Sequence, residues 1–202
     1  METRFEAVVL AGGSGSRFGG GKLTAPWRGG ALIDGALAAA FAAPVRTVTV
    51  VTGADAKVEA AARAFAERTG VADRLRLTDC ADHADGMGHT LLAGIAALPD
   101  DTVGAFVFLG DMPLIPPAIL PKLADALAGG AAAAAPMFEG QRGHPVLFSR
   151  ELFLDLLNLS GDRGARDILR TLGDRLAVID AGDAGIHVDI DSPGDIDKID
   201  SR

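Results

Sequence analysis

Phe5-Glu-Ala-Val-Val-Leu10 is a short apolar run, and the glycine-rich segment Ala11-Gly-Gly-Ser-Gly-Ser-Arg17-Phe-Gly-Gly-Gly-Lys22 follows it directly. An apolar run of this length, stopped by glycines, is typical of a strand that is buried on both faces. Glycines after such a strand let backbone N–H groups approach an anion closely, and Arg17 and Lys22 add positive charge. The stretch therefore predicts the first strand of an α/β fold, with a polyphosphate-binding loop at its carboxyl end.

Downstream of this loop, strand-like and helix-like segments alternate. Apolar or β-branched runs next to glycines predict strands, and apolar residues at helical spacing predict helices. This alternation predicts one three-layer, doubly wound α/β domain over residues 1–202, with a mostly parallel sheet. The predicted strands after the first are 47–52, 76–78, 103–109, 131–136, 143–148, 177–180 and 186–190, and the predicted helices are 31–43, 55–69, 90–98, 116–127, 149–159, 165–171 and 193–199.

Composition excludes several classes of protein. The 202-residue chain has a net charge of −8, from 27 acidic and 19 basic residues, and no basic cluster that would suit a nucleic acid. No signal-peptide pattern opens the sequence, and no apolar stretch is long enough to cross a membrane, so we expect a cytoplasmic protein without a membrane partner. The single cysteine, Cys80, is expected to fill space in the interior.

Two common phosphate-binding motifs do not fit the glycine-rich segment. The P-loop pattern G-x-x-x-x-G-K-[ST] needs a glycine in place of Ser16 and a hydroxyl residue in place of Leu23. The dinucleotide pattern G-x-G-x-x-G, begun at Gly13, needs a glycine in place of Phe18. The remaining general alternative to a phosphate-binding loop is a surface turn in which Arg17 and Lys22 are simply solvated.

The pattern L-A-G-G-x-G-x-R-x-G-x-x-K is more specific. It resembles the signature of the MobA-like nucleotidyltransferases, a branch of the nucleotide-diphospho-sugar transferase fold, which is Rossmann-like. The resemblance implies an enzyme that transfers a nucleotide from an NTP, with Arg17 and Lys22 as catalytic cations. It also implies that the loop binds the nucleotide through Leu10, Ala11, Gly12, Gly13, Gly15, Arg17 and Lys22.

Two further segments resemble the nucleotide and metal elements of the same family. The segment starting at Gly86 reads G-M-x-x-T where the family has G-M-x-x-S, which implies that Gly86 and Thr90 bind nucleotide. Leu109-Gly-Asp-Met-Pro113 resembles the D-x-P segment after the central strand, which implies that Asp111 is catalytic and binds Mg²⁺. Considered without the family, the first segment is a helix start and the second is an Asp that caps a turn.

Gly140-Gln-Arg-Gly-His-Pro-Val-Leu-Phe148 is the most discriminating segment. It is similar to a segment of the molybdenum cofactor cytidylyltransferases and their close relatives, and 161–166 resembles the G-D-x-G-A-R element of the same group. The resemblance implies that Arg142, His144 and Arg166 bind the phosphorylated acceptor, a molybdopterin that carries molybdenum. A molybdoenzyme or its chaperone is then an expected partner.

The segment Val188-Asp-Ile-Asp-Ser-Pro-Gly-Asp195 resembles the D-I-D-T-P-E-D stretch near the end of the family pattern. Alternation along the strand predicted at 186–190 places Asp189 and Asp191 on one side, so either could complete the magnesium site. Asp189 is favoured as the second metal ligand. Asp191 remains the alternative, with a helix-capping role near Ser192 as its other explanation.

The choice between CTP and GTP is open. The later segments favour CTP, whereas Leu10-Ala-Gly-Gly13 is more typical of the guanylyltransferase relatives than the L-A-A-G of the cytidylyl group. The reaction implied is attack of an acceptor phosphate oxygen on the α-phosphorus of the NTP, with release of pyrophosphate. The alternatives are transfer from another NTP to a different phosphorylated acceptor, and a non-catalytic nucleotide- or cofactor-binding chaperone on the same fold.

Overall fold

A computed structural model describes residues 4–13, 18–53, 55–82, 86–158 and 165–200. The strands are β1 (Phe5–Leu10), β2 (Pro26–Trp27), β3 (Gly30–Ala31), β4 (Val48–Thr52), β5 (Leu75–Asp79), β6 (Gly104–Leu109), β7 (Ala133–Phe138), β8 (Gln141–Arg142), β9 (Val146–Ser149) and β10 (Leu176–Asp180). The α-helices are α1 (Ile33–Ala42), α2 (Ala56–Thr69), α3 (Met87–Ala96), α4 (Ile119–Ala128), α5 (Phe153–Leu157), α6 (Arg166–Thr171) and α7 (Pro193–Asp200).

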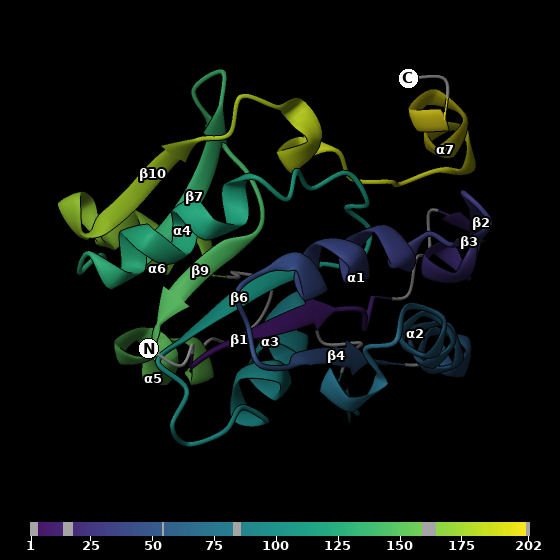
Figure 1. Cartoon of the computed structure of the whole chain (residues 1–202), viewed down its shortest axis with the longest axis horizontal. Helices are drawn as coiled ribbons and strands as arrows, with labels where there is room; N and C mark the ends of the chain where they lie inside the picture. The colour runs from purple at the N-terminus through teal and green to yellow at the C-terminus, as the bar shows by residue number, and fades with distance from the viewer. Residues whose placement is uncertain (1–3, 14–17, 54, 83–85, 159–164, 201–202) are drawn as a thin grey trace.

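Eight strands of the described chain form one mixed, mostly parallel sheet (Figure 1). Its order is β10-β7-β9-β6-β1-β4-β5, with the short β8 paired to β7. Only β8 and β9 run antiparallel to their neighbours in this sheet, and the other pairs are parallel. The predicted parallel α/β sheet is therefore confirmed, and β1 lies inside it between β4 and β6.

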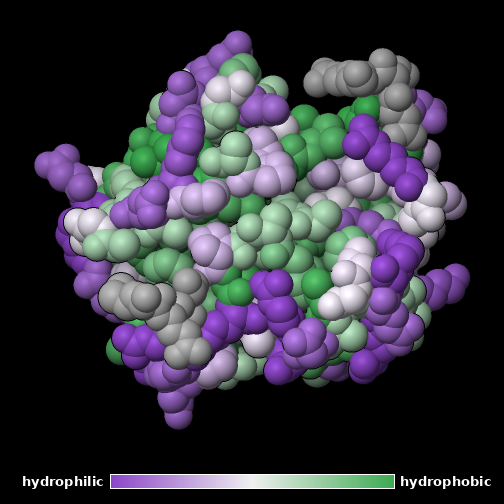
Figure 2. Space-filling model, in the orientation of Figure 1, coloured by the Kyte–Doolittle hydropathy of each residue, from purple (hydrophilic) through white to green (hydrophobic). Residues whose placement is uncertain are grey.

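Helices cover both faces of this sheet, as a doubly wound fold requires. Alternate residues of β1 point to opposite faces. Ala7 and Val9 join an apolar core with α1, α2 and α4, whereas Val8 and Leu10 join a second core with α3, α5 and α6. Figure 2 shows hydrophilic side chains around the rim of one face of the molecule and paler residues at its centre. Among the described residues, no helix is long and apolar enough to span a membrane.

A third apolar cluster lies at the end of the molecule where α7 packs near the β2–β3 hairpin (Figure 1). Trp27 and Leu32, from the hairpin and its exit, are buried against Ile190 and Ile199 from the C-terminal segment. The sequence pattern did not predict this hairpin, because its strands are only two residues long. The cluster therefore holds the β2–β3 hairpin, which follows the glycine-rich loop, against the segment that leads into α7.

The strand predicted at 186–190 is wrong. A 3₁₀ helix, Ala184–His187, occupies its first half. The backbone groups of this segment bond to loops that are distant in the sequence: the Ile186 carbonyl accepts from His144 N at 3.1 Å, and Ile190 N donates to the Asp111 carbonyl at 3.1 Å. Because these two backbone groups are already bonded to loop residues, the segment does not pair with a strand of the sheet. The strand predicted at 131–136 is confirmed as β7, shifted two residues toward the C-terminus.

Candidate active site

Asp111 lies at the carboxyl ends of two neighbouring strands, β1 and β6. These strands pair in parallel with Leu10 opposite Leu109, so both end at the same level. Gly110 N then donates to the Leu10 carbonyl at 3.0 Å. A Cβ atom added to Gly110 would lie 3.0 Å from the same oxygen, so a larger residue would push the two strand ends apart. The glycine therefore allows Asp111 to lie beside the exit of β1.

Lys22 reaches this edge through the last part of the glycine-rich segment. Residues 19–21 all have φ between 66° and 95°, a left-handed conformation that glycine adopts at no steric cost. A short 3₁₀ helix, Lys22–Thr24, follows them. Its Leu23 side chain is buried in the core and would contact any Cβ added to Gly110 at 3.4 Å. Burial of Leu23 fixes this turn against the strand ends.

The Lys22 ammonium contacts two carboxylates from distant parts of the chain. Its Nζ atom lies 2.7 Å from Asp111 Oδ2 and 3.3 Å from Asp191 Oδ1. Only 13% of the lysine side chain is exposed, against 25% for Asp111 and 49% for Asp191. Burial lowers the pKa of Lys22, but hydrogen bonds and charge from both carboxylates outweigh it, so the pKa is raised and the ammonium keeps its charge.

Asp191 is placed by the residue before it. Ile190 is fully buried in the third apolar cluster, against Trp27, and its backbone N–H holds the Asp111 carbonyl. On the other side, the backbone N–H groups of Asp191 and Ser192 donate to Asp195 at the start of α7. In the sequence, Ile190 stands between Asp189 and Asp191. This apolar residue is the signal that the segment is anchored to the core beside the site.

Asp189, favoured in the sequence analysis, is exposed to solvent. No described residue forms a hydrogen bond or an ion pair with it, and the strand that motivated its choice is absent from the described chain. Its role as a metal ligand stays a prediction. The structure instead brings Asp191 to Lys22 and Asp111.

The remaining nucleotide-binding predictions fall on two elements. Leu10, Ala11 and Gly12 are buried at the exit of β1, whereas Gly13 is exposed, with open space around its α-carbon. Gly15 and Arg17 lie outside the described residues. The second element is α3, which begins after Gly86, whose φ of 114° suits only glycine.

Thr90 lies in the first turn of α3, and its role in nucleotide binding stays a prediction. It is 3% exposed, and its hydroxyl forms a hydrogen bond with the Cys80 thiol. Burial raises the pKa of Cys80, and hydrogen bonds with the Asp82 backbone and Thr90 oppose that rise. Cys80 therefore fills buried space as expected, and Thr90 supports the first turn of α3 from the inside.

The three predicted acceptor residues lie on the β8–β9 turn and at the start of α6. Arg142, in β8, and Arg166, the first residue of α6, are both exposed. His144 precedes a cis peptide bond to Pro145, and its Nδ1 atom is buried without a hydrogen-bond partner among the described residues. Burial, aided by the charge of Arg166, lowers the pKa of His144 to about 4, while the Val107 backbone and Asp111 oppose the shift. His144 is thus a neutral hydrogen-bonding group within electrostatic range of Asp111 and Arg166.

Acidification from pH 7 to pH 5 is expected to reduce the free energy of unfolding through His144 by about 2 kcal/mol. The unfolded chain protonates this imidazole near pH 6.5, whereas the folded protein does so only near pH 4. This contribution is complete above pH 6.5 and is lost as the pH falls toward 4. Urea unfolding of the wild type and of His144→Gln at both pH values measures it, and an equal loss in both proteins would contradict a buried neutral imidazole.

Comparisons with known proteins identify the family of the chain. The family described as MobA-like NTP transferase domain matches residues 7–176. The molybdenum cofactor cytidylyltransferase of Escherichia coli (strain K12) is 27% identical, over 94% of this chain and 92% of its own length. The purine catabolism protein PucB of Bacillus subtilis (strain 168) is 31% identical, over 95% of this chain and 94% of its own length.

The solved structures show the same fold. A nucleotidyl transferase from a species of Methanothermobacter superposes with a TM-score of 0.73 at 25% identity, covering 96% of this chain and 95% of its own. The family match begins at the third residue of β1, ends at the first residue of β10, and includes Lys22, Asp111, Arg142 and His144. The chain therefore belongs to the MobA-like NTP transferase family and has the fold of a nucleotidyltransferase.

Proposed function

We propose that this protein is a Mg²⁺-dependent nucleotidyltransferase that moves a nucleotide monophosphate from an NTP, with CTP favoured, to the phosphate of molybdenum-bearing molybdopterin. The observation that carries the proposal is the convergence of Lys22, Asp111 and Asp191 at the carboxyl ends of β1 and β6. In α/β sheets of this kind, ligands bind outside the carboxyl ends of the strands. The glycine-rich loop leaves β1 at the same edge.

The donor set fits a magnesium ion. Asp111 Oδ2 and Asp191 Oδ1 both approach a single nitrogen atom, so the two oxygens point to one position between them. Mg²⁺ is usually held by one or two carboxylates together with substrate phosphates, and two carboxylates from separate segments supply this. When bound, the ion would neutralise charge on the triphosphate and on the pyrophosphate that leaves.

The chain's own residues would orient the reactants. Backbone N–H groups at Gly12, Gly13 and Gly15 would contact the triphosphate, with Arg17 and Lys22 as cations. Arg142 and Arg166 would bind the acceptor phosphate, and neutral His144 would donate or accept one hydrogen bond beside it. Phosphoryl transfer depends mainly on such positioning and charge stabilisation, which is why the set contains cations and no strong base.

Two other candidate functions are each supported by a specific observation. Gly12, in place of the alanine usual in the cytidylyl group, favours GTP as the donor. The name of the PucB relative, a purine catabolism protein, favours an acceptor other than molybdopterin. A non-catalytic chaperone on the same fold is disfavoured, because such a protein would have no need for a partly buried lysine held between two carboxylates.

Pyrophosphate release tests the proposal. Purified protein with Mg²⁺ is expected to release pyrophosphate from CTP, faster than from GTP, ATP or UTP, only when molybdopterin that carries molybdenum is present. A preference for GTP would assign the guanylyl alternative, and turnover with a different phosphorylated acceptor would replace the acceptor assignment. No release with any NTP and acceptor, from protein that melts cooperatively, would overturn the proposed enzyme.

A further inference from the structure

The Lys22 ammonium occupies the position that the two carboxylates of the candidate metal site define. Its Nζ atom lies within 2.7 Å of Asp111 Oδ2 and 3.3 Å of Asp191 Oδ1, distances at which a cation bridges the two oxygens. The ammonium reaches that position from the partly buried turn that Leu23 fixes in the core. In this arrangement the lysine places one positive charge between the two aspartates.

A divalent cation and this ammonium cannot both occupy the space between the two carboxylates. An ion bound to both oxygens would lie almost in contact with Nζ, and two positive groups at that separation repel strongly in a partly buried site. Binding of the ion therefore requires the lysine side chain to swing away. A side chain that is 87% covered and holds two ion pairs gives these up only when another anion receives its charge.

We propose that Lys22 closes the metal site of the nucleotide-free protein, so that a divalent cation enters together with the triphosphate rather than before it. This inference rests on the proposed function, because the triphosphate is the anion that would draw Lys22 away from the two aspartates. The lysine then has two sequential partners: the carboxylates in the resting protein and the phosphates in the complex. Without nucleotide, the site would reject the Mg²⁺ that is always present around it.

Mn²⁺ binding in the absence of nucleotide tests the inference. Mn²⁺ has the same preference for oxygen ligands and is counted directly by its electron paramagnetic resonance signal. Wild-type protein is expected to bind Mn²⁺ weakly, whereas Lys22→Met, which keeps an unbranched side chain only one atom shorter and removes its charge, is expected to bind at least about tenfold more tightly. Lys22→Gln serves as a second neutral variant if Lys22→Met does not melt cooperatively.

Three comparisons separate a closed site from a general effect of charge. Lys22→Arg, which keeps the charge, should bind Mn²⁺ as weakly as the wild type. Lys198→Met removes a charge from the Asp195 ion pair on exposed α7 and should leave the affinity unchanged. Adding Asp191→Asn to Lys22→Met should abolish the gain, because one of the two oxygens loses its charge.

Equal Mn²⁺ affinity in the wild type and the neutral Lys22 variants would overturn the inference, as would an equal gain in Lys198→Met. A gain that survives Asp191→Asn would place the ion elsewhere and also overturn it. The titration contains no nucleotide and no acceptor, so it is independent of the pyrophosphate assay. A protein that gained affinity as expected but released no pyrophosphate would keep the closed site and lose the proposed enzyme.

Discussion

Asp111→Asn is expected to lower the rate of Mg²⁺-dependent pyrophosphate release by about a thousandfold, equivalent to about 4 kcal/mol of transition-state stabilisation. The amide keeps the shape of the side chain but cannot supply the negative charge that a divalent cation requires. It also removes the shorter of the two ion pairs of Lys22, at 2.7 Å. Initial rates at saturating CTP, acceptor and Mg²⁺ measure the effect.

The fold should survive this substitution. The Asp111 side chain is one-quarter exposed, and the contact that anchors the C-terminal segment is made by its backbone carbonyl, which accepts from Ile190 N. The thermal midpoint of the variant should therefore stay close to that of the wild type. A rate within a few-fold of the wild type would mean that Asp111 holds neither the metal nor the lysine during catalysis.

Asp189→Asn and Asp191→Asn form a matched pair that distinguishes the two readings of the C-terminal segment. The substitutions are chemically identical and two residues apart. Asp191→Asn should reduce turnover strongly, because Asp191 Oδ1 lies 3.3 Å from the lysine ammonium, whereas Asp189→Asn should retain most of it. The reverse order would restore Asp189, the choice from the sequence, as the second metal ligand.

Sequence patterns predicted the central parallel strands because each is an apolar or β-branched run followed closely by glycine. Val103 to Leu109 and Thr47 to Thr52 are such runs, and β6 and β4 occupy them. Asp111 was found for the same reason, since it directly follows the clearest of these strands. The structure places it beside the exit of β1, where the prediction required it.

The second aspartate could not be chosen from the sequence. Alternation along a strand treats Asp189 and Asp191 alike, and only a tertiary contact distinguishes them. That contact is the burial of Ile190 against Trp27, together with the hydrogen bond from Ile190 N to Asp111. Trp27 is far away in sequence and belongs to a hairpin with two-residue strands, which carries no periodic signal.

The neutral state of His144 could not be predicted from the sequence either. A histidine in a glycine- and proline-containing turn is expected to be exposed and to titrate near pH 6.5. Burial of its ring beside β6 depends on the path of the 3₁₀ helix Ala184–His187, which approaches Gly143 so closely that an added Cβ would lie 2.3 Å from the Ile186 carbonyl. The protonation state follows from this packing, which no local pattern specifies.

Arg46→Ala is expected to reduce the free energy of unfolding by about 3–5 kcal/mol, out of the 5–15 kcal/mol typical of whole domains. The reason is Glu6, a fully buried residue of β1 whose Oε1 accepts from Arg46 Nε at 2.7 Å. Its other oxygen accepts from Thr47 N at 2.8 Å and from Thr47 Oγ1 at 2.6 Å. Without Arg46 the carboxylate would remain buried with no opposite charge.

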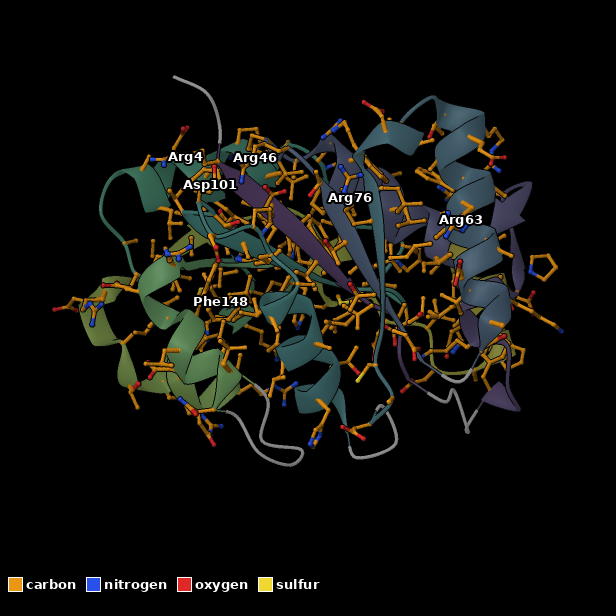
Figure 3. The ribbon with its side chains drawn as sticks, turned by 90° about the horizontal axis from the view of Figure 1, so that it is seen from below. Arg4, Arg46, Arg63, Arg76, Asp101 and Phe148 are labelled. Carbon is orange, nitrogen blue, oxygen red and sulfur yellow. The ribbon has the colours of Figure 1, made fainter. Side chains whose placement is uncertain are left out.

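Asp101 provides the matched control, because it binds the same guanidinium from the solvent side. It accepts from Arg46 at 2.7 and 2.9 Å, and its side chain is half exposed. Figure 3 shows Asp101 and Arg46 close to each other. Exposed ion pairs contribute little because water and salt screen them, so Asp101→Ala should change the unfolding free energy far less than Arg46→Ala. Urea denaturation of the two single variants measures the difference.

A double variant identifies the buried charge as the cause. Glu6→Gln removes the charge while keeping an oxygen for Thr47, so Glu6→Gln/Arg46→Ala should be more stable than Arg46→Ala alone. If the double variant were less stable than Arg46→Ala, the loss would come from missing contacts of the arginine side chain rather than from an unpaired carboxylate. This cluster lies at the amino end of β1, and Lys22 and Asp111 lie at its carboxyl end. The folded fraction of Arg46→Ala should therefore keep the wild-type rate of pyrophosphate release, because the substitution changes stability and leaves the candidate active site intact.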